Sequence, residues 1–222
     1  MIMIIRSIIL TLLFAALSPA AELTHNFGLK AAVTRSGLSN NRAYYQGIST
    51  GYRTGVNFAV LMEINFSEHI HFLPQLEYVQ KGYQLYYEGN HQANNYYEIL
   101  DPDARFDYFS MPIFVKFLVP GKTISAALSL GIRAEQIIHE KRALVKTPDG
   151  TKSFYESPDL RDTNLGGSIM LGFDIMRALP VILSLEVRYN FDFGRLTPFS
   201  DDEYDLGPTR ISSFDVWLGF RF

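Results

Sequence analysis

The chain ends on the stretch Phe214-Asp215-Val216-Trp217-Leu218-Gly219-Phe220-Arg221-Phe222. Its apolar residues Phe214, Val216, Leu218, Phe220 and Phe222 occupy every second position, which is the side-chain period of a β-strand with one apolar face. A final strand that runs to a terminal aromatic residue is typical of bacterial outer-membrane barrels. We therefore predict that these five residues close a barrel and form the signal that the barrel-assembly machinery reads.

The same alternation recurs along the chain, whereas helical spacing is rare. The clearest example runs from Val56 to Phe66, where every second residue is apolar. We predict an all-β fold, an eight-stranded antiparallel up-and-down transmembrane barrel. Its expected strands are Asn26–Ser36, Tyr52–Phe66, His69–Tyr86, Arg105–Phe117, Thr123–Glu140, Asn164–Met176, Val181–Phe193 and Arg210–Phe222.

The connections between these strands alternate in length. Three are short, at Ser67-Glu68, Pro120-Gly121-Lys122 and Arg177–Pro180. Four are long and polar, roughly at Gly37–Gly51, Tyr87–Ala104, Lys141–Thr163 and Gly194–Thr209. Short periplasmic turns and long outer loops are the arrangement expected of outer-membrane barrels.

The bulky apolar face of each strand is expected to point outward into lipid. A soluble, lipocalin-like barrel would alternate too, but an eight-stranded barrel has room inside only for packed side chains. Small residues such as Gly55, Ala59 and Ser129 fill the opposite face. Aromatic residues near strand ends are expected to form two interfacial girdles: Phe66, Phe72, Phe117 and Phe222 on the inner side, and Tyr108, Phe109, Tyr189, Phe191 and Phe193 on the outer side.

The inward face also carries charges of both signs in equal number. The cations are Lys30, Arg53, Lys81, Lys116, Arg133, Arg188 and Arg221, and the anions are Glu63, Glu77, Glu135, Asp174, Glu186, Asp192 and Asp215. Charges in a narrow interior are tolerated when they are paired and hydrogen-bonded. We predict an ion-pair network that plugs the lumen; a conducting or ligand-lined channel is the alternative.

The beginning of the chain has the composition of a secretory signal peptide. Arg6 precedes an apolar run from Ile8 to Leu17, and Ser18 and Ala20 flank a proline. The run is about ten residues long, half of the roughly 20 that a membrane-spanning helix needs. We predict a signal peptide at residues 1–20, cleavage after Ala20, and one barrel domain at residues 21–222. The chain has no cysteine, which excludes disulfides and lipoprotein anchoring.

Several segments resemble the PorT-like outer-membrane β-barrel family. The family's "P-E-L-x-Y-x-x-K-G" strand is similar to Pro74–Gly82, with Gln75 in place of Glu, and its "L-E-I-P-L-L-x-K" strand is similar to Phe109–Lys116, with Phe109-Ser110-Met111 in place of Leu-Glu-Ile. Phe27–Thr34, the Gly55-Val56-Asn57-Phe58 strand, Leu183–Asn190 and Leu218–Phe222 also fit the family. The resemblance implies an eight-stranded outer-membrane barrel, and the namesake's role implies a protein-secretion system.

Candidate reactive residues are few. His139 and Glu140 are the one pair that suggests catalysis at the outer rim, although a solvated strand end explains them better. A metal site at His69 and His71 would need Glu63 or Glu68 as third ligand, and the acidic run Asp201–Asp205 could bind calcium. We expect no cofactor, no metal and no catalytic residue.

The expected function is therefore structural or partner-binding at the cell surface. The net charge is −3 and no cluster of Lys or Arg stands out, so nucleic acid is not an expected partner. The expected partners are outer-membrane lipid, the barrel-assembly machinery, and a surface or secretion protein bound through the outer loops, where Tyr86, Tyr87, Tyr96 and Tyr97 offer amphipathic contact area. A component of a secretion system, a small-solute pore and a ligand binder remain alternatives.

Overall fold

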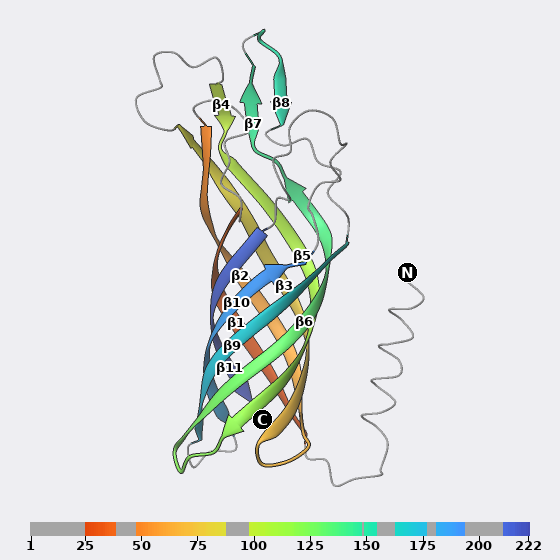
Figure 1. Ribbon diagram of the computed structural model, residues 1–222, viewed down its shortest axis with the longest axis vertical. Helices are drawn as coiled ribbons and strands as arrows, with labels where there is room; N and C mark the ends of the chain where they lie inside the picture. Colours follow the sequence, from red (N-terminus) through yellow and green to blue (C-terminus); the bar gives the residue numbers. More distant parts are fainter. Residues whose placement is uncertain are drawn as a thin grey trace.

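Alternating apolar and polar residues build a closed antiparallel barrel of eight strands (Figure 1). The computed structural model describes residues 25–38, 48–87, 98–147, 149–154, 163–176, 181–193 and 211–222. The barrel strands are β1 (His25–Leu38), β2 (Ile48–Asn65), β3 (Ile70–Tyr87), β5 (Asp103–Val119), β6 (Ile124–Lys141), β9 (Thr163–Met176), β10 (Ile182–Asp192) and β11 (Ile211–Arg221). The predicted fold class is confirmed, and every predicted strand overlaps one of these.

The last strand closes the barrel against the first. The order around the barrel is β1-β11-β10-β9-β6-β5-β3-β2, so β11 pairs with both β10 and β1. The ladder continues one residue beyond β11, because the backbones of Phe222 and Phe27 exchange two hydrogen bonds of 2.9 and 3.0 Å. Closure leaves the barrel with no strand edge in the apolar part of its wall, which is a requirement for a sheet in lipid.

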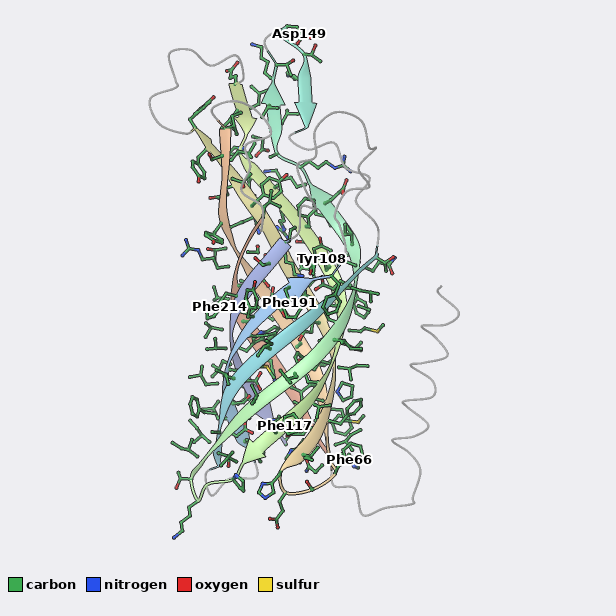
Figure 2. All side chains as sticks on the ribbon, viewed as in Figure 1. Phe66, Tyr108, Phe117, Asp149, Phe191 and Phe214 are labelled. Carbon is green, nitrogen blue, oxygen red and sulfur yellow. The ribbon has the colours of Figure 1, made fainter. Side chains whose placement is uncertain are left out.

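An apolar belt surrounds the outside of the barrel, and the alternate residues of the same strands fill its interior. On β6, Leu128, Leu130 and Ile132 are exposed, whereas Ser129 and Arg133, at alternate positions, are buried. Phe66 and Phe117 lie near the end with the short turns, and Phe191 and Phe214 lie higher on the wall (Figure 2).

One residue of the predicted outer girdle is placed wrongly by the sequence. Tyr108 is 1% exposed and lies inside the barrel, whereas its neighbour Phe109 faces outward. Adjacent residues of one strand face opposite sides of the sheet, so both could not belong to the girdle. Tyr108 is instead stacked under the ammonium group of Lys81, 5.2 Å from the ring centroid.

Four adjacent strands continue beyond the apolar belt at the long-loop end. β2, β3, β5 and β6 have 17 or 18 residues each, whereas β1 and β9 have 14 and β10 and β11 have 11. A small sheet of β4 (Glu98–Asp101), β7 (Leu144–Lys146) and β8 (Lys152–Phe154) stands above this extension (Figure 1).

This small sheet occupies segments that the sequence predicted as loops. Its hairpin turns at Asp149-Gly150, where Gly150 has a φ of +87°, a conformation that glycine adopts without steric cost. The Asp-Gly pair between the short segments of β7 and β8 is itself a hairpin signal that could have revealed the turn.

The interior changes in character along the barrel axis. Inside the extension, buried apolar side chains including Ile48, Leu85, Phe106, Val145 and Ile211 form a hydrophobic core. Below this core, within the height of the apolar belt, charged side chains share the interior with two small buried apolar clusters, one of Ala32, Ala59 and Trp217 and one of Leu73, Phe114 and Met170. The part of the chain described here contains no helix long and apolar enough to cross a membrane.

Candidate functional site: layers of charge inside the barrel

The layer nearest the short turns is a closed ring of four charges. Glu63 of β2, Lys116 of β5, Asp174 of β9 and Arg221 of β11 come from alternate strands around the barrel. Lys116 Nζ lies 3.0 Å from Glu63 Oε1 and also pairs with Asp174, while Arg221 pairs with both carboxylates. Each charge therefore contacts the two opposite charges beside it, and the ring crosses the whole interior.

His71 extends this ring toward the short-turn end. Its Nδ1 lies 2.6 Å from Oε1 of Glu63, which already receives a hydrogen bond from Lys116. The sequence singled out His71 only as a possible metal ligand together with His69. The structure separates the two, because His71 points inward while the exposed His69 lies in the turn, with Nδ1 3.2 Å from the carbonyl oxygen of Leu118.

The next layer spans the barrel from wall to wall. Arg188 of β10 binds both carboxylate oxygens of Glu77 on the diametrically opposite strand β3, at 2.8 and 2.9 Å. Its guanidinium carbon lies 4.4 Å from the ring centroid of Trp217. Lys30 of β1 pairs with Glu186 of β10 at 2.6 Å. The charges of this layer come from β1, β3 and β10, which belong to the alternate strands that the first ring does not use. Trp217 comes from β11, which also contributes to the first ring.

A third layer lies under the hydrophobic core of the extension. Lys81 Nζ is 2.7 Å from Glu135 and 3.8 Å from Asp192. Arg133 pairs with the same two carboxylates, at 3.1 Å for Glu135. Two cations and two anions thus share one site, which distributes the charge over three strands.

Twelve of the fourteen inward-facing charges that the sequence named lie in these pairs: Lys30, Glu63, Glu77, Lys81, Lys116, Arg133, Glu135, Asp174, Glu186, Arg188, Asp192 and Arg221. Asp215 is also buried but forms no ion pair with a described residue. Its carboxylate accepts hydrogen bonds from the hydroxyl of Thr34 and, at 2.6 Å, from the amide of Asn190.

The remaining charge of the inward face, Arg53, lies above the belt and pairs with Asp103 at 2.9 Å. Arg53 lies within the register shift of the β2–β3 ladder between Tyr52 and Asn57. The alternation continues through this stretch, because Tyr52 and Thr54 are exposed while Gly55 and Asn57 are buried, so Arg53 keeps the inward face.

Because these charged side chains are buried, each of them needs a partner of opposite charge or a hydrogen bond. Removing a charged group from water costs several kcal/mol, which a partner in good geometry offsets. A complete network can be close to neutral for stability, but a network that has lost one member leaves an uncompensated buried charge. Among the described residues, every charge of the three layers is therefore committed to an opposite charge, and Asp215 is committed to Thr34 and Asn190.

The other candidate residues do not assemble into a reactive site. His139 and Glu140 are both exposed at the outer end of β6, and Glu140 pairs with Arg142 at 2.7 Å. No group of three His, Cys, Asp or Glu within the described ranges could hold a metal ion. The acidic run Asp201–Asp205, the residues Tyr96 and Tyr97, and the predicted signal peptide lie outside the described residues.

Ion pairs also cover the outer extension, but in contact with water. Lys141 lies 2.9 Å from Asp101, and Lys146 lies 3.3 Å from Glu98. The hydrogen bond from Lys141 holds the pKa of the Asp101 carboxyl below its usual range. Exposed pairs of this kind contribute little to stability. They give the extension a polar surface that carries charges of both signs.

Comparison with known proteins supports the architecture. The profile of the protein family described as "Outer membrane protein beta-barrel domain" matches residues 18–197. The structure is similar to the outer membrane protein OprG from Pseudomonas aeruginosa, with a TM-score of 0.50, 13% identity and coverage of 90% of this chain and 95% of that chain.

Two further similarities to solved structures are weaker. A major outer membrane protein from Thermus thermophilus has a TM-score of 0.48 at 12% identity and covers 90% of this chain and 100% of its own. Neisserial surface protein A has a TM-score of 0.46 at 16% identity and covers 88% and 95%. A comparison with curated proteins found no match.

Proposed function

Since the chain belongs to the outer membrane protein beta-barrel domain family and resides in the outer membrane, we propose that it is a non-enzymatic, non-conducting barrel that displays a protein-binding surface outside the cell. The long-loop end is then the outer end, and the short turns face the periplasm. The claim that the barrel does not conduct rests on the charge layers across the lumen.

These layers leave little opportunity for a solute to pass. The ring of Glu63, Lys116, Asp174 and Arg221 links strands all around the barrel, and the Arg188–Glu77 pair joins opposite walls. Above them, the hydrophobic core of the extension fills the interior with apolar side chains. A hydrated ion would have to break several buried ion pairs and then enter this core, both of which are costly.

Conductance in a planar bilayer tests the closed lumen. We expect the purified protein, inserted at a density confirmed by gel or fluorescence, to show no single-channel steps above the lipid background. A matched variant, Arg188→Ala, removes the side chain that spans the second layer and serves as a comparison in the same bilayer. Regular unitary steps from the unaltered protein would establish a small-solute pore and contradict this half of the proposal.

The outer extension supports the second half of the proposal. Four strands carry the sheet of β4, β7 and β8 above the rest of the barrel (Figure 1). Exposed Tyr86, Leu100 and Ile138 give this region apolar contact area among the ion pairs. Aromatic and aliphatic anchors within a polar rim are the composition of protein-binding surfaces.

A photo-crosslinking amino acid at Tyr86 or Leu100 tests this surface in living cells. We expect a discrete higher-mass adduct from these outer positions, and none from Ile124, which is exposed in the apolar belt at the periplasmic end. Adducts to lipid alone from all positions would contradict a protein partner. If the adduct contained components of a secretion machine, the role implied by the resemblance to PorT-like barrels would gain direct support.

The terminal strand is proposed to direct assembly as well as to close the barrel. Phe222 contributes two backbone hydrogen bonds to Phe27, and its side chain is exposed to lipid. We expect Phe222→Ala, which keeps the backbone, to lower the amount of heat-modifiable protein in the outer membrane severalfold. The matched variant Phe173→Ala removes an exposed ring of β9, outside the predicted signal, and should leave the membrane level close to that of the unaltered protein. Unchanged membrane levels for Phe222→Ala would contradict a signal in the terminal ring.

A further inference from the structure

One arginine lies on the lipid-facing side of the barrel, at the border between the apolar belt and the outer extension. Arg35 of β1 is exposed and follows Val33, a belt residue that is 57% exposed, on the same face. Two residues along a strand correspond to roughly 7 Å. Its cross-strand neighbours are Phe214 of β11, which is still apolar and exposed, and Thr54 of β2. Arg35 is therefore at the height where lipid chains give way to headgroups.

Arg35 differs from the other cations on the outer parts of the barrel strands. Arg53, Arg105 and Lys141 each pair with a carboxylate, at 2.9, 2.7 and 2.9 Å. Arg35 forms no ion pair with any residue that the structure describes, and neither of its cross-strand neighbours is acidic. A guanidinium at a membrane surface with no counter-ion among the described residues is matched in charge and geometry to a phosphate oxygen pair.

The side chain of Arg35 is also held in place. Its guanidinium carbon lies 4.8 Å from the ring centroid of Tyr52, which is 62% exposed. The ring of Tyr52 in turn lies on Gly37, because a Cβ added at Gly37 would meet Cδ1 of Tyr52 at 2.8 Å. The absence of a side chain at Gly37 thus lets the ring lie across β1 and support the guanidinium.

We propose that Arg35 and Tyr52 form a binding site for the phosphorylated headgroup of a lipid in the outer leaflet. The guanidinium binds the phosphate, and the face and hydroxyl of Tyr52 contact the polar part of the headgroup. The lipid chains then lie along the apolar belt below, against Val33 and Phe214. This continuity of a cationic group with an apolar wall favours an anchored lipid over a free anion, because a free anion would gain nothing from the belt.

Lipid retention by the purified full-length protein tests the site. The protein is refolded in detergent, mixed with diphosphoryl lipid A, and examined by native mass spectrometry for bound lipid. We expect Arg35→Gln to weaken retention roughly fivefold to tenfold, the loss of one cation at a membrane surface. Gly37→Ala should weaken it roughly twofold to threefold by displacing the ring that supports the guanidinium.

The matched control is Arg105→Gln, which removes a cation of the extension that is already paired with Asp107. It should retain lipid A as the unaltered protein does, and heat-modifiable migration shows that each variant is folded. Equal retention by Arg35→Gln would overturn the proposal, as would equal binding of lipid A stripped of its phosphates. Release of the lipid by millimolar inorganic phosphate would assign the site to a free anion instead.

Discussion

Replacing Glu63 with glutamine is expected to lower the free energy of unfolding by about 3 to 5 kcal/mol. The change keeps the size of the side chain but removes one of the two negative charges of the four-charge ring nearest the short turns. Lys116 and Arg221, both buried, would then share Asp174 as their remaining ring anion. His71 would also lose the carboxylate that lies 2.6 Å from its Nδ1.

Equilibrium unfolding from lipid vesicles in guanidinium chloride measures this effect. The chain has one tryptophan, and Trp217 is fully buried beside Arg188, so its fluorescence reports whether the interior is intact. The control is Glu68→Gln in the exposed periplasmic turn, which should change stability by less than about 0.5 kcal/mol. Equal effects of the two substitutions would mean that the ring is hydrated and tolerates an unpaired charge.

Placing an arginine on the lipid face at mid-height of the barrel is expected to have the second large effect. Leu130 is 47% exposed on β6 and is flanked on its own face by Leu128 and Ile132, also exposed. An arginine at the bilayer midplane of an outer-membrane barrel costs roughly 2 to 4 kcal/mol. We therefore expect Leu130→Arg to lower the unfolding free energy by that amount and to reduce the folded fraction.

The control at the same position is Leu130→Phe, which changes the shape of the side chain but not its polarity. Because lipid adapts to shape, this variant should stay close to the unaltered protein in the same unfolding experiment. If Leu130→Arg were as stable as Leu130→Phe, the belt residue would not face hydrocarbon at this depth.

Glu63 and Leu130 lie on opposite faces of the barrel wall, and the protein needs a different kind of side chain on each face. The belt provides the free energy of membrane insertion, because side chains such as Leu130 move from water into lipid and carry no polar group that would lose its hydration. The interior cannot use the same residues, because an eight-stranded barrel has no space for a second row of large apolar side chains. Within the belt, paired charges with long, thin side chains share the lumen with two small apolar clusters around Trp217 and Phe114, and the larger hydrophobic core lies above it.

Predicting the barrel did not require its tertiary structure. Strands such as β6 and β11 alternate so regularly that one face could be assigned to lipid and the other to the interior from the order of residues alone. The alternation of short and long connections predicted the antiparallel order of the strands and which end of the barrel faces the cell exterior. The identity of the interior charges followed from the same parity, because a side chain's face depends only on whether its position is odd or even within a regular strand.

The pairing partners could not be obtained in this way. Arg188 and Glu77 lie on opposite walls, 111 residues apart in the chain, and which carboxylate meets which cation depends on barrel order and stagger. The same holds for Asp215, which pairs with Thr34 and Asn190 rather than with a cation. Parity also could not give the height of Arg53, which keeps the inward face but pairs with Asp103 above the charge layers.

The sequence by itself therefore determined the barrel, its strands, its lipid-facing side and the set of charges inside, because each depends on a local repeat of two residues. Only the tertiary structure decided the ring around Glu63, the pair across the lumen, the outer sheet of β4, β7 and β8, and the placement of Arg35 on Tyr52. These features join residues that are distant in the chain, and their geometry arises from the closure and shear of the whole barrel rather than from any one strand.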